Sequence, residues 1–279
     1  MSMRLIIKNA EKLFRNFFPK RLKKYRNIIN LLKNKKGIEI GGPSFAFSKR
    51  GFIPIYQIIN SLDGCNFSND TIWEGKISEG LNFKFDDREG WQYIKDAVCL
   101  EGIESEKYDF ILSCHSLEHI ANPIKAIEEW KRVLKTSGYI LIIVPHKEKT
   151  FDRKRTVTTI EHIIEDYKKE ITEDDQTHFQ DVILNHDFSI DPGILNQAEF
   201  IKRTKNNQLN RCLHHHVFNT KLLVELIQFC KLKIIEVDHF SPFHIVLLAQ
   251  KTNMHFSNEN WLDANSSIYS NSLFQSDKK

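Results

Sequence analysis

Two apolar segments with one amphipathic helix between them constrain the fold of this 279-residue chain more than any other feature. The segments Tyr108–Ser113 and Tyr139–Val144 are predominantly apolar, as expected of strands that are buried on both faces. Between them, Asn122 and Pro123 suit the cap and the first turn of a helix, and Gly138 suits its end. A strand, a helix and a strand joined by short connections predict a right-handed parallel crossover and an α/β fold.

A second constraint is the segment Lys36–Ser44, in which a short apolar strand carrying Glu39 runs into Gly41 and Gly42. Two glycines allow the backbone to turn sharply and to approach a ligand without interference from Cβ atoms. The segment departs from the dinucleotide-binding fingerprint, because a proline and a serine stand where further glycines would cradle a pyrophosphate. An acidic residue just before the glycines suits a cationic or amino-bearing ligand. On its residues alone, the loop fits ligand binding and an ordinary strand-to-helix turn equally well.

Two further features surround this core. The segments Lys233–Val237 and His244–Ala249 are strand candidates joined by a short proline-containing link, which favours antiparallel pairing. Residues 146–213 interrupt the alternation with a polar segment that has helical stretches at about 159–171 and 193–205. An insertion at the ligand-binding edge of a sheet suits an acceptor-binding lid, and it also suits an oligomerisation surface.

The segments Glu39–Gly42, Tyr108–Ile120 and Leu134–Gly138 resemble the class I S-adenosylmethionine (SAM)-dependent methyltransferases. In detail they are similar to methyltransferase-domain proteins associated with bacterial surface-glycan synthesis. The resemblance covers residues 37–145 and 214–251. It implies a Rossmann-like, seven-stranded, mostly parallel sheet with a C-terminal antiparallel hairpin and a helical insertion. It also implies SAM as the cofactor and, as the activity, O-methylation of a sugar or glycan precursor.

The resemblance further implies where the donor binds. Asp63 lies 24 positions beyond Glu39, near the spacing at which a carboxylate accepts hydrogen bonds from ribose hydroxyls, although Asp63-Gly64 is also a good turn pair. Asp96 follows the third predicted strand, where an acid would face the adenine amine, and it could equally cap the following turn. The predicted donor site comprises Glu39, Gly41, Gly42, Pro43, Asp63, Asp96, Ala97 and Ser113.

Histidines are the candidates for acceptor chemistry. His115 follows the fourth strand, together with Glu118 and His119, at the edge where donor and acceptor should meet. A base or a substrate-orienting group there is one interpretation, and a helix cap or a supporting hydrogen bond is the other. Further along, His214, His215 and His216 are consecutive, and a histidine with a pKa near neutrality could take a proton from an acceptor hydroxyl. We predict His115, His214 and His215 as the catalytic candidates, with structural hydrogen bonding as the alternative.

The same histidine run also raises the question of a metal. If residues 214–216 are extended, the first and third side chains point one way and the second points the other, so the three cannot converge on one ion. Two of them with His186 or Asp187 would suffice, but the sequence does not establish that proximity. We therefore predict no metal site.

The two ends of the chain differ from its centre. Residues 1–36 contain 12 Lys or Arg and one acid, against a net charge of +4 for the whole chain. Interleaved phenylalanines make this basic extension suited to an anionic lipid surface or to packing on the body, and no nucleic-acid-binding motif accompanies it. Residues 37–251 form the expected domain, and the polar residues 252–279 are expected to be a flexible tail.

Composition bounds the cellular setting. No run of 18 apolar residues is present, and the first residues lack the pattern of a secretory signal. The five cysteines are odd in number and include no CxxC pair, which fits a reducing compartment. We expect a cytoplasmic protein whose partner is a small-molecule or glycan acceptor.

Two other functions compete with methyl transfer. One is a nicotinamide-dependent sugar-nucleotide oxidoreductase or epimerase, which is disfavoured by the residues after the glycine pair and by the absence of a Tyr-x-x-x-Lys pair beyond the fourth strand. The other is a catalytically silent SAM-binding module in a glycan-assembly complex, because no single residue here compels catalysis.

Overall fold

An eight-stranded sheet organises the protein, which we describe from a computed structural model covering residues 20–191 and 196–278. The strand order is β5-β6-β2-β1-β7-β8-β10-β9. The central strands are parallel, and β10 runs antiparallel to both of its neighbours. The strands are β1 (Lys36–Ile40), β2 (Ser61–Asn66), β5 (Gly80–Phe85), β6 (Arg88–Ile94), β7 (Tyr108–Cys114), β8 (Leu134–Pro145), β9 (Lys233–Phe240) and β10 (His244–Gln250).

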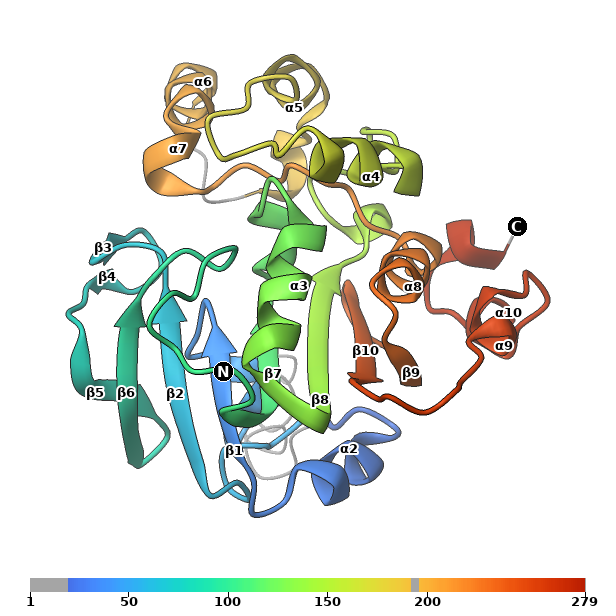
Figure 1. Cartoon of the computed structure of the whole chain (residues 1–279). Helices are drawn as coiled ribbons and strands as arrows, with labels where there is room; N and C mark the ends of the chain where they lie inside the picture. The colour runs from blue at the N-terminus through green and yellow to red at the C-terminus, as the bar shows by residue number, and fades with distance from the viewer. Residues whose placement is uncertain (1–19, 192–195, 279) are drawn as a thin grey trace, which may run out of the picture.

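This arrangement confirms the predicted fold class, with one strand more than the seven expected. The extra strand, β5, pairs antiparallel with β6 at the edge of the sheet through a two-residue turn at Asp86 and Asp87. Asp86 has a φ of 50°, which short polar residues tolerate in such tight hairpins. A second small hairpin, β3 (Asp70–Thr71) and β4 (Gly75–Lys76), lies near the carboxyl end of the sheet (Figure 1).

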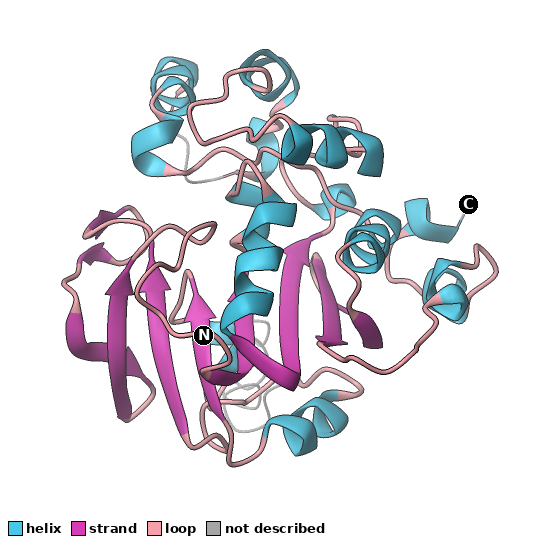
Figure 2. Cartoon of the chain, viewed as in Figure 1, coloured by secondary structure: helices cyan, strands magenta, loops and turns pink. Residues whose placement is uncertain are grey.

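Helices and loops cover both faces of the sheet (Figures 1 and 2). On one face, α3 (Pro123–Val133) and α8 (Thr220–Phe229) contribute to a continuous apolar core with β1, β7, β8 and β10. On the other face, α2 (Tyr25–Leu32) packs with the irregular segment 45–59. The short helices α9 (Glu259–Leu262) and α10 (Ser267–Ser270) lie beside α8.

The predicted crossover from β7 through α3 to β8 is present. The start of its helix is as predicted, whereas the helix ends earlier than predicted. The Asn122 side chain accepts a hydrogen bond from the Lys125 backbone N–H, and Pro123 opens the helix. The helix ends before Leu134, so Gly138 is not its stop but lies inside β8. A Cβ atom at Gly138 would lie 2.8 Å from the Asp109 carbonyl oxygen, which explains the glycine.

The second parallel strand also differs from its prediction. The sequence suggests a strand from Phe52 to Leu62, whereas β2 begins at Ser61 and ends at Asn66. Ile53, Ile55 and Ile59 are buried in turns against the sheet rather than in a strand. An apolar segment alone does not distinguish a buried strand from a buried covering layer.

The described residues of the insertion include the α-helices α4 (Ile160–Lys168), α5 (Phe179–Asn185), α6 (Gln197–Lys205) and α7 (Asn207–Asn210). Figure 1 shows them as a cap over the carboxyl ends of the parallel strands. The predicted lid position is therefore where these helices lie.

The C-terminal residues expected to be a flexible tail pack on the domain as far as residue 278. Asp277 is buried, and it accepts hydrogen bonds from Thr220 Oγ1 at 2.6 Å and Ser272 Oγ at 2.7 Å. Phe274 stacks on His146 with ring centroids 3.9 Å apart. Residues 1–19, which hold the predicted lipid-facing phenylalanines, lie outside the described part of the chain. Among the described helices, none combines the length and apolar character needed to cross a bilayer.

Candidate active site

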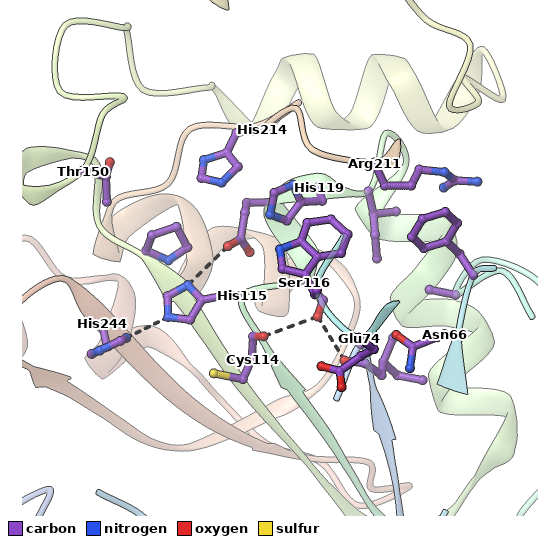
Figure 3. A pocket seen from close by; sticks show the side chains of 18 of the residues that line it. Asn66, Glu74, Cys114, His115, Ser116, His119, Thr150, Arg211, His214 and His244 are labelled. Atoms are coloured by element: carbon purple, nitrogen blue, oxygen red, sulfur yellow. Dashed lines mark hydrogen bonds and ion pairs between the residues drawn. The ribbon is translucent and has the colours of Figure 1, made fainter. Parts of the chain in front are cut away.

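A cavity of about 570 Å³ opens at the carboxyl edge of the parallel strands, beneath the insertion (Figure 3). This edge is where ligands bind in open α/β sheets. Its lining combines strand tips with residues of the insertion. Residues from the strand tips include Ile40, Gly41, Pro43, Asn66, Asp96, Ala97, Cys114, His115, Ser116, Glu118 and His119, and residues from further along the chain include Lys149, Thr150, Phe151, Ile190, Arg211, His214 and His244.

Gly41 begins the turn after β1 in a conformation that requires glycine. Its φ is +78°, and an added Cβ would lie 2.3 Å from Ser116 Oγ. Ser116 cannot readily turn away, because its hydroxyl donates a hydrogen bond of 3.0 Å to the Ile40 carbonyl. The loops after β1 and β7 are thereby held together, and the cavity floor is bare backbone at this point.

Glu39, predicted to bind the donor, supports this loop from below and does not itself line the cavity. Its carboxylate accepts hydrogen bonds from the Ser44 backbone N–H at 2.9 Å and from the Tyr56 hydroxyl at 2.6 Å. Burial raises the pKa of Glu39 to about 7 despite these bonds. A Cβ at Gly42 would lie 2.2 Å from the Glu39 carboxyl carbon, so Gly42 accommodates Glu39 and does not itself line the cavity.

Asp63, predicted to contact the ribose, is not at the tip of β2 and does not line the cavity. It lies within the strand, where its carboxylate accepts hydrogen bonds from the Tyr108 hydroxyl at 2.7 Å and from the Trp91 N–H at 3.2 Å. Asn66 ends the strand and lines the cavity instead. The Asn66 amide donates a hydrogen bond to the Gly42 carbonyl at 3.1 Å, which leaves its own oxygen available to a ligand hydroxyl.

Asp96 and Ala97, two of the predicted donor-binding residues, follow β6 and line the cavity. One Asp96 carboxylate oxygen accepts from the Val98 N–H at 3.1 Å, so the turn-capping interpretation also holds. The other oxygen accepts from Arg211 Nη2 at 2.8 Å. Arg211 also pairs with Glu173 at 2.9 Å, so it ties the insertion to the tip of β6.

Ser113 and His215, two other predicted site residues, lie away from the cavity. Ser113 is fully buried inside β7, one residue before the part of the strand that reaches the edge. His215 is buried beside Asn207, whose amide donates to its Nε2 at 3.0 Å. The histidine run is irregular in structure, so strict alternation does not apply to it.

His115 lines the cavity at the end of β7 with a φ of 52°, a conformation that non-glycine residues adopt at a cost. Its Nε2 lies 2.8 Å from His244 Nδ1, and its Nδ1 lies 3.3 Å from Glu118 Oε1. Burial alone would raise the pKa of Glu118, but the hydrogen bond from His115 and the charges of His115, His119 and His214 together outweigh it, and the pKa lies below its usual value. A carboxylate is therefore held ionised at the floor of the cavity.

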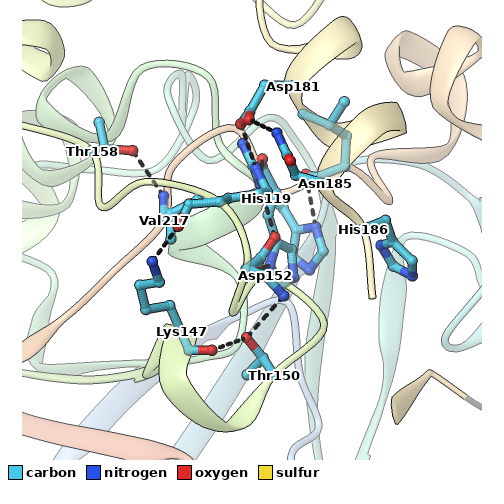
Figure 4. A network of polar contacts seen from close by, with 12 residues as sticks. His119, Lys147, Thr150, Asp152, Thr158, Asp181, Asn185, His186 and Val217 are labelled. Atoms are coloured by element: carbon cyan, nitrogen blue, oxygen red, sulfur yellow. Dashed lines mark hydrogen bonds and ion pairs between the residues drawn. The ribbon is translucent and has the colours of Figure 1, made fainter. Parts of the chain in front are cut away.

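His214 is oriented by a buried carboxylate. Asp152 Oδ2 lies 2.6 Å from His214 Nδ1, and Asp152 Oδ1 accepts from Arg155 Nη1 at 2.9 Å. Burial would lower the pKa of His214, but the Asp152 carboxylate outweighs it and raises that pKa above its usual value. Because Nδ1 faces Asp152, the Nε2 of His214 is left for the cavity. Figure 4 shows Asp152 among the polar contacts that join the segment after β8 to α5.

His119 lies against His214 with ring centroids 4.5 Å apart (Figure 3). Its Nδ1 lies 3.1 Å from the Leu213 carbonyl, so it carries its proton there. Burial first, and then the charge of His214, lower the pKa of His119 to about 3. The pair thus combines a basic imidazole with one that stays neutral.

Sequence reasoning missed three cavity features. Asn66 was hidden by the misplaced start of β2, and Asp152 gave no local signal because its partner is 62 positions away. Trp73, half exposed in the β3–β4 hairpin, lines the cavity mouth within 5.3 Å of His119, measured between ring centroids. An aromatic residue in a polar loop was the available signal.

Comparison with known proteins bears on the activity. Residues 80–142 match the family described as a methyltransferase domain. No curated protein matches the chain. Similar solved structures include a SAM-dependent methyltransferase from Aquifex aeolicus, with 12% identity, a TM-score of 0.41, and coverage of 83% of this chain and 90% of that one. Another, from Mesorhizobium loti, has 10% identity and a TM-score of 0.46, covering 81% and 95%. At TM-scores below 0.5, these structural similarities add no evidence beyond the strand order of this chain.

The family match covers β5, β6, β7, α3 and most of β8, which build one side of the cavity. The antiparallel β10 beside β8 is the arrangement expected of class I methyltransferases and differs from the dinucleotide fold. The match and the strand order identify SAM-dependent methyl transfer as the activity and SAM as the donor, and they leave the acceptor open.

Proposed function

We propose that this protein methylates a hydroxyl group of a sugar or glycan precursor, with His214 as the base. The observation that carries the proposal is the His214–Asp152 pair, in which His214 lines the cavity and Asp152 holds it from behind. The sugar part is suggested by the sequence resemblance and by the character of the cavity mouth.

The donor half of the cavity fits SAM in three respects. Gly41 presents bare backbone after β1, Asn66 offers an amide oxygen after β2, and Asp96 and Ala97 offer a carboxylate and an apolar surface after β6. In this half, ribose hydroxyls would bind at Asn66 and the adenine at Asp96 and Ala97. When bound, SAM supplies a methyl group on a positively charged sulfur, which makes that methyl electrophilic.

The acceptor half is formed by residues of the insertion and the β3–β4 hairpin. Trp73 and Phe151 present aromatic surface, and Lys149 and Thr150 add polar groups. A sugar ring has apolar C–H faces that suit aromatic side chains and hydroxyls that need hydrogen-bonding partners. A mixed aromatic and polar wall therefore favours a sugar over a purely apolar acceptor.

A neutral hydroxyl is a poor nucleophile until it loses its proton. His214 Nε2 is placed to take that proton while Asp152 keeps the tautomer and stabilises the resulting imidazolium. With SAM bound, the hydroxyl oxygen would take the methyl group as the carbon–sulfur bond breaks, leaving a neutral thioether, while His214 holds the released proton. Holding donor and acceptor in line supplies much of the acceleration.

Transfer of tritium from methyl-labelled SAM to sugar nucleotides and cell-envelope extracts tests the proposal. We expect label in a carbohydrate fraction with the wild-type protein, a loss of at least about a hundredfold with His214→Gln, and full transfer with His255→Gln, which alters an exposed histidine. Label appearing in protein or lipid amines would refute the hydroxyl acceptor. Binding of SAM without transfer to any fraction would instead support the silent module.

A further inference from the structure

Four side chains of types that bind metals come together where α4 and the start of α5 meet the histidine run, outside the cavity described above. His162 and Asp166 lie one turn apart on α4, His178 immediately precedes α5, and His216 belongs to the segment that leads to α8. One potential ligand atom from each lies within 4.8 Å of all the others. None of the four lines the cavity.

Two of the distances between these atoms match those within a tetrahedral coordination shell. His162 Nε2 lies 3.3 Å from His178 Nε2 and 3.2 Å from Asp166 Oδ2. Zinc binds imidazole nitrogen at about 2.0–2.1 Å and carboxylate oxygen at about 2.0–2.2 Å, and tetrahedral angles then place neighbouring ligand atoms about 3.3–3.4 Å apart. The His162–Asp166 approach does not satisfy Asp166 Oδ2 as a hydrogen bond, so convergence on a shared point explains it better.

Two buried atoms in the group have no hydrogen-bond partner among the described residues, namely Asp166 Oδ2, whose contact is with His162, and His216 Nδ1. His216 is buried, and its Nε2 lies 3.1 Å from the Ala121 carbonyl oxygen. The carbonyl only accepts, so Nε2 carries the proton and Nδ1 presents a lone pair to the cluster. A backbone carbonyl on the far side of the ring is the usual support of a metal-binding histidine.

We propose that His162, Asp166, His178 and His216 bind one zinc ion in a closed tetrahedral site. Three imidazoles and one carboxylate fill four positions, as in a structural site, and leave none for substrate. The ion would join α4, the start of α5 and the histidine run into one unit. His214 is two residues from His216, so the same ion would hold the proposed base over the cavity.

This proposal departs from the sequence-based expectation of no metal. That expectation considered the three consecutive histidines as a group with His186 or Asp187. In the structure, His216 instead finds its partners on α4 and before α5, while His186 lies 3.1 Å from Asp191 and Asp187 pairs with Arg153. The zinc site does not depend on the proposed acceptor.

Metal analysis of the full-length protein, purified without a metal-affinity tag, tests the site. We expect about one zinc per chain, and a drop of at least tenfold in zinc content with His178→Gln or Asp166→Asn. The exposed-surface variant His255→Gln is the matched control and should retain its zinc. Removal of zinc with a chelator should lower the melting temperature, and added zinc should restore it.

Two other groups of described residues also have ligand atoms within 4.8 Å of one another and must be distinguished: Glu118, His119 and His214 at the cavity, and Asp175, His178 and His215, which shares His178 with the proposed site. Zinc retained by His119→Gln and lost by Asp166→Asn supports the proposed site, because Asp166 belongs to neither of the other groups, and the reverse pattern overturns it. Because a ligand variant can fail to fold, cobalt exchange into the wild-type protein provides an independent readout. The visible absorption of tetrahedral cobalt(II) is expected, and protein that takes up neither zinc nor cobalt would overturn the proposal.

Discussion

Replacing Asp152 by asparagine tests whether His214 acts as the base only when Asp152 holds it in the correct tautomer. Asparagine keeps the shape of the side chain but removes the charge, and its amide can donate to Nδ1, which would place the imidazole proton on the nitrogen that faces the cavity. The base would then be lost although the ring stays in place. Since general-base catalysis contributes about 10²–10⁴-fold, we expect kcat to fall within that range.

The pH dependence gives a second readout of the same change. The wild-type enzyme needs neutral His214, so its rate should rise as pH increases through the pKa that Asp152 raises above the usual histidine value. Without the carboxylate, burial dominates and the pKa of His214 falls. The residual activity of Asp152→Asn should therefore have its acidic limb at lower pH than the wild-type enzyme.

Stability should fall as well. Burial would raise the pKa of Asp152, but His214 and Arg155 outweigh it and lower that pKa to about 2 from a usual 3.8. A depressed carboxylate pKa contributes stability that is present above about pH 4 and is lost as pH falls toward 2, and a shift of this size corresponds to roughly 2 kcal/mol at neutral pH. Chemical denaturation at pH 7 and pH 3 measures this term: the difference between wild type and variant should shrink at the lower pH.

Asp181→Asn is the matched control for this experiment. Asp181 accepts from Arg155 Nε at 2.7 Å, on the side of the guanidinium away from His214, and it is partly exposed. It should reproduce part of the stability loss without moving the acidic limb. A kcat for Asp152→Asn within threefold of wild type, with an unmoved acidic limb, would refute the role of His214 as base.

Four further variants test the cavity. Gly41→Ala should abolish SAM binding in calorimetry and lower the free energy of unfolding by about 1–2 kcal/mol, because the φ of Gly41 is positive and an added Cβ would lie 2.3 Å from Ser116 Oγ. Unchanged affinity for SAM would argue against a role of this loop in donor binding. Asn66→Ala should weaken SAM binding about tenfold. Asp63→Asn should leave the affinity for SAM unchanged and lower the melting temperature, because Asp63 accepts a hydrogen bond from Tyr108. The opposite pattern would restore Asp63 as the ribose-binding residue. Trp73→Ala should raise KM for the acceptor and leave the affinity for SAM unchanged, and an equal loss for both would remove Trp73 from the acceptor wall.

The crossover from β7 to β8 could be predicted because burial on both faces leaves a continuous apolar segment in the sequence. Gly138 misled the prediction because a glycine after a helix suits both a helix end and a tight packing site in a strand. The misplacement of Asp63 follows from one error, since the apolar residues 52–62 were assigned to β2 and the true strand tip then lay three residues further on. A carboxylate near the expected spacing does not by itself reveal the strand end.

The acceptor side was predictable only in outline. His115 and His214 could be selected because one follows a buried strand and the other lies in an unusual histidine run. Which member of that run faces the cavity depends on Asp152 and Asn207, and neither contact has a local signature in the sequence. Residues contributed by a long insertion come together through tertiary packing, so periodicity does not reveal them.

Calorimetric titration of the full-length protein with SAM and with its demethylated product tests the central claim most directly. The account predicts one saturable site for each compound, with affinity reduced at least tenfold by Asn66→Ala and unchanged by His255→Gln. Protein that unfolds cooperatively, and is therefore folded, yet shows neither heat nor a melting-temperature shift with either compound would contradict a donor site at this edge of the sheet.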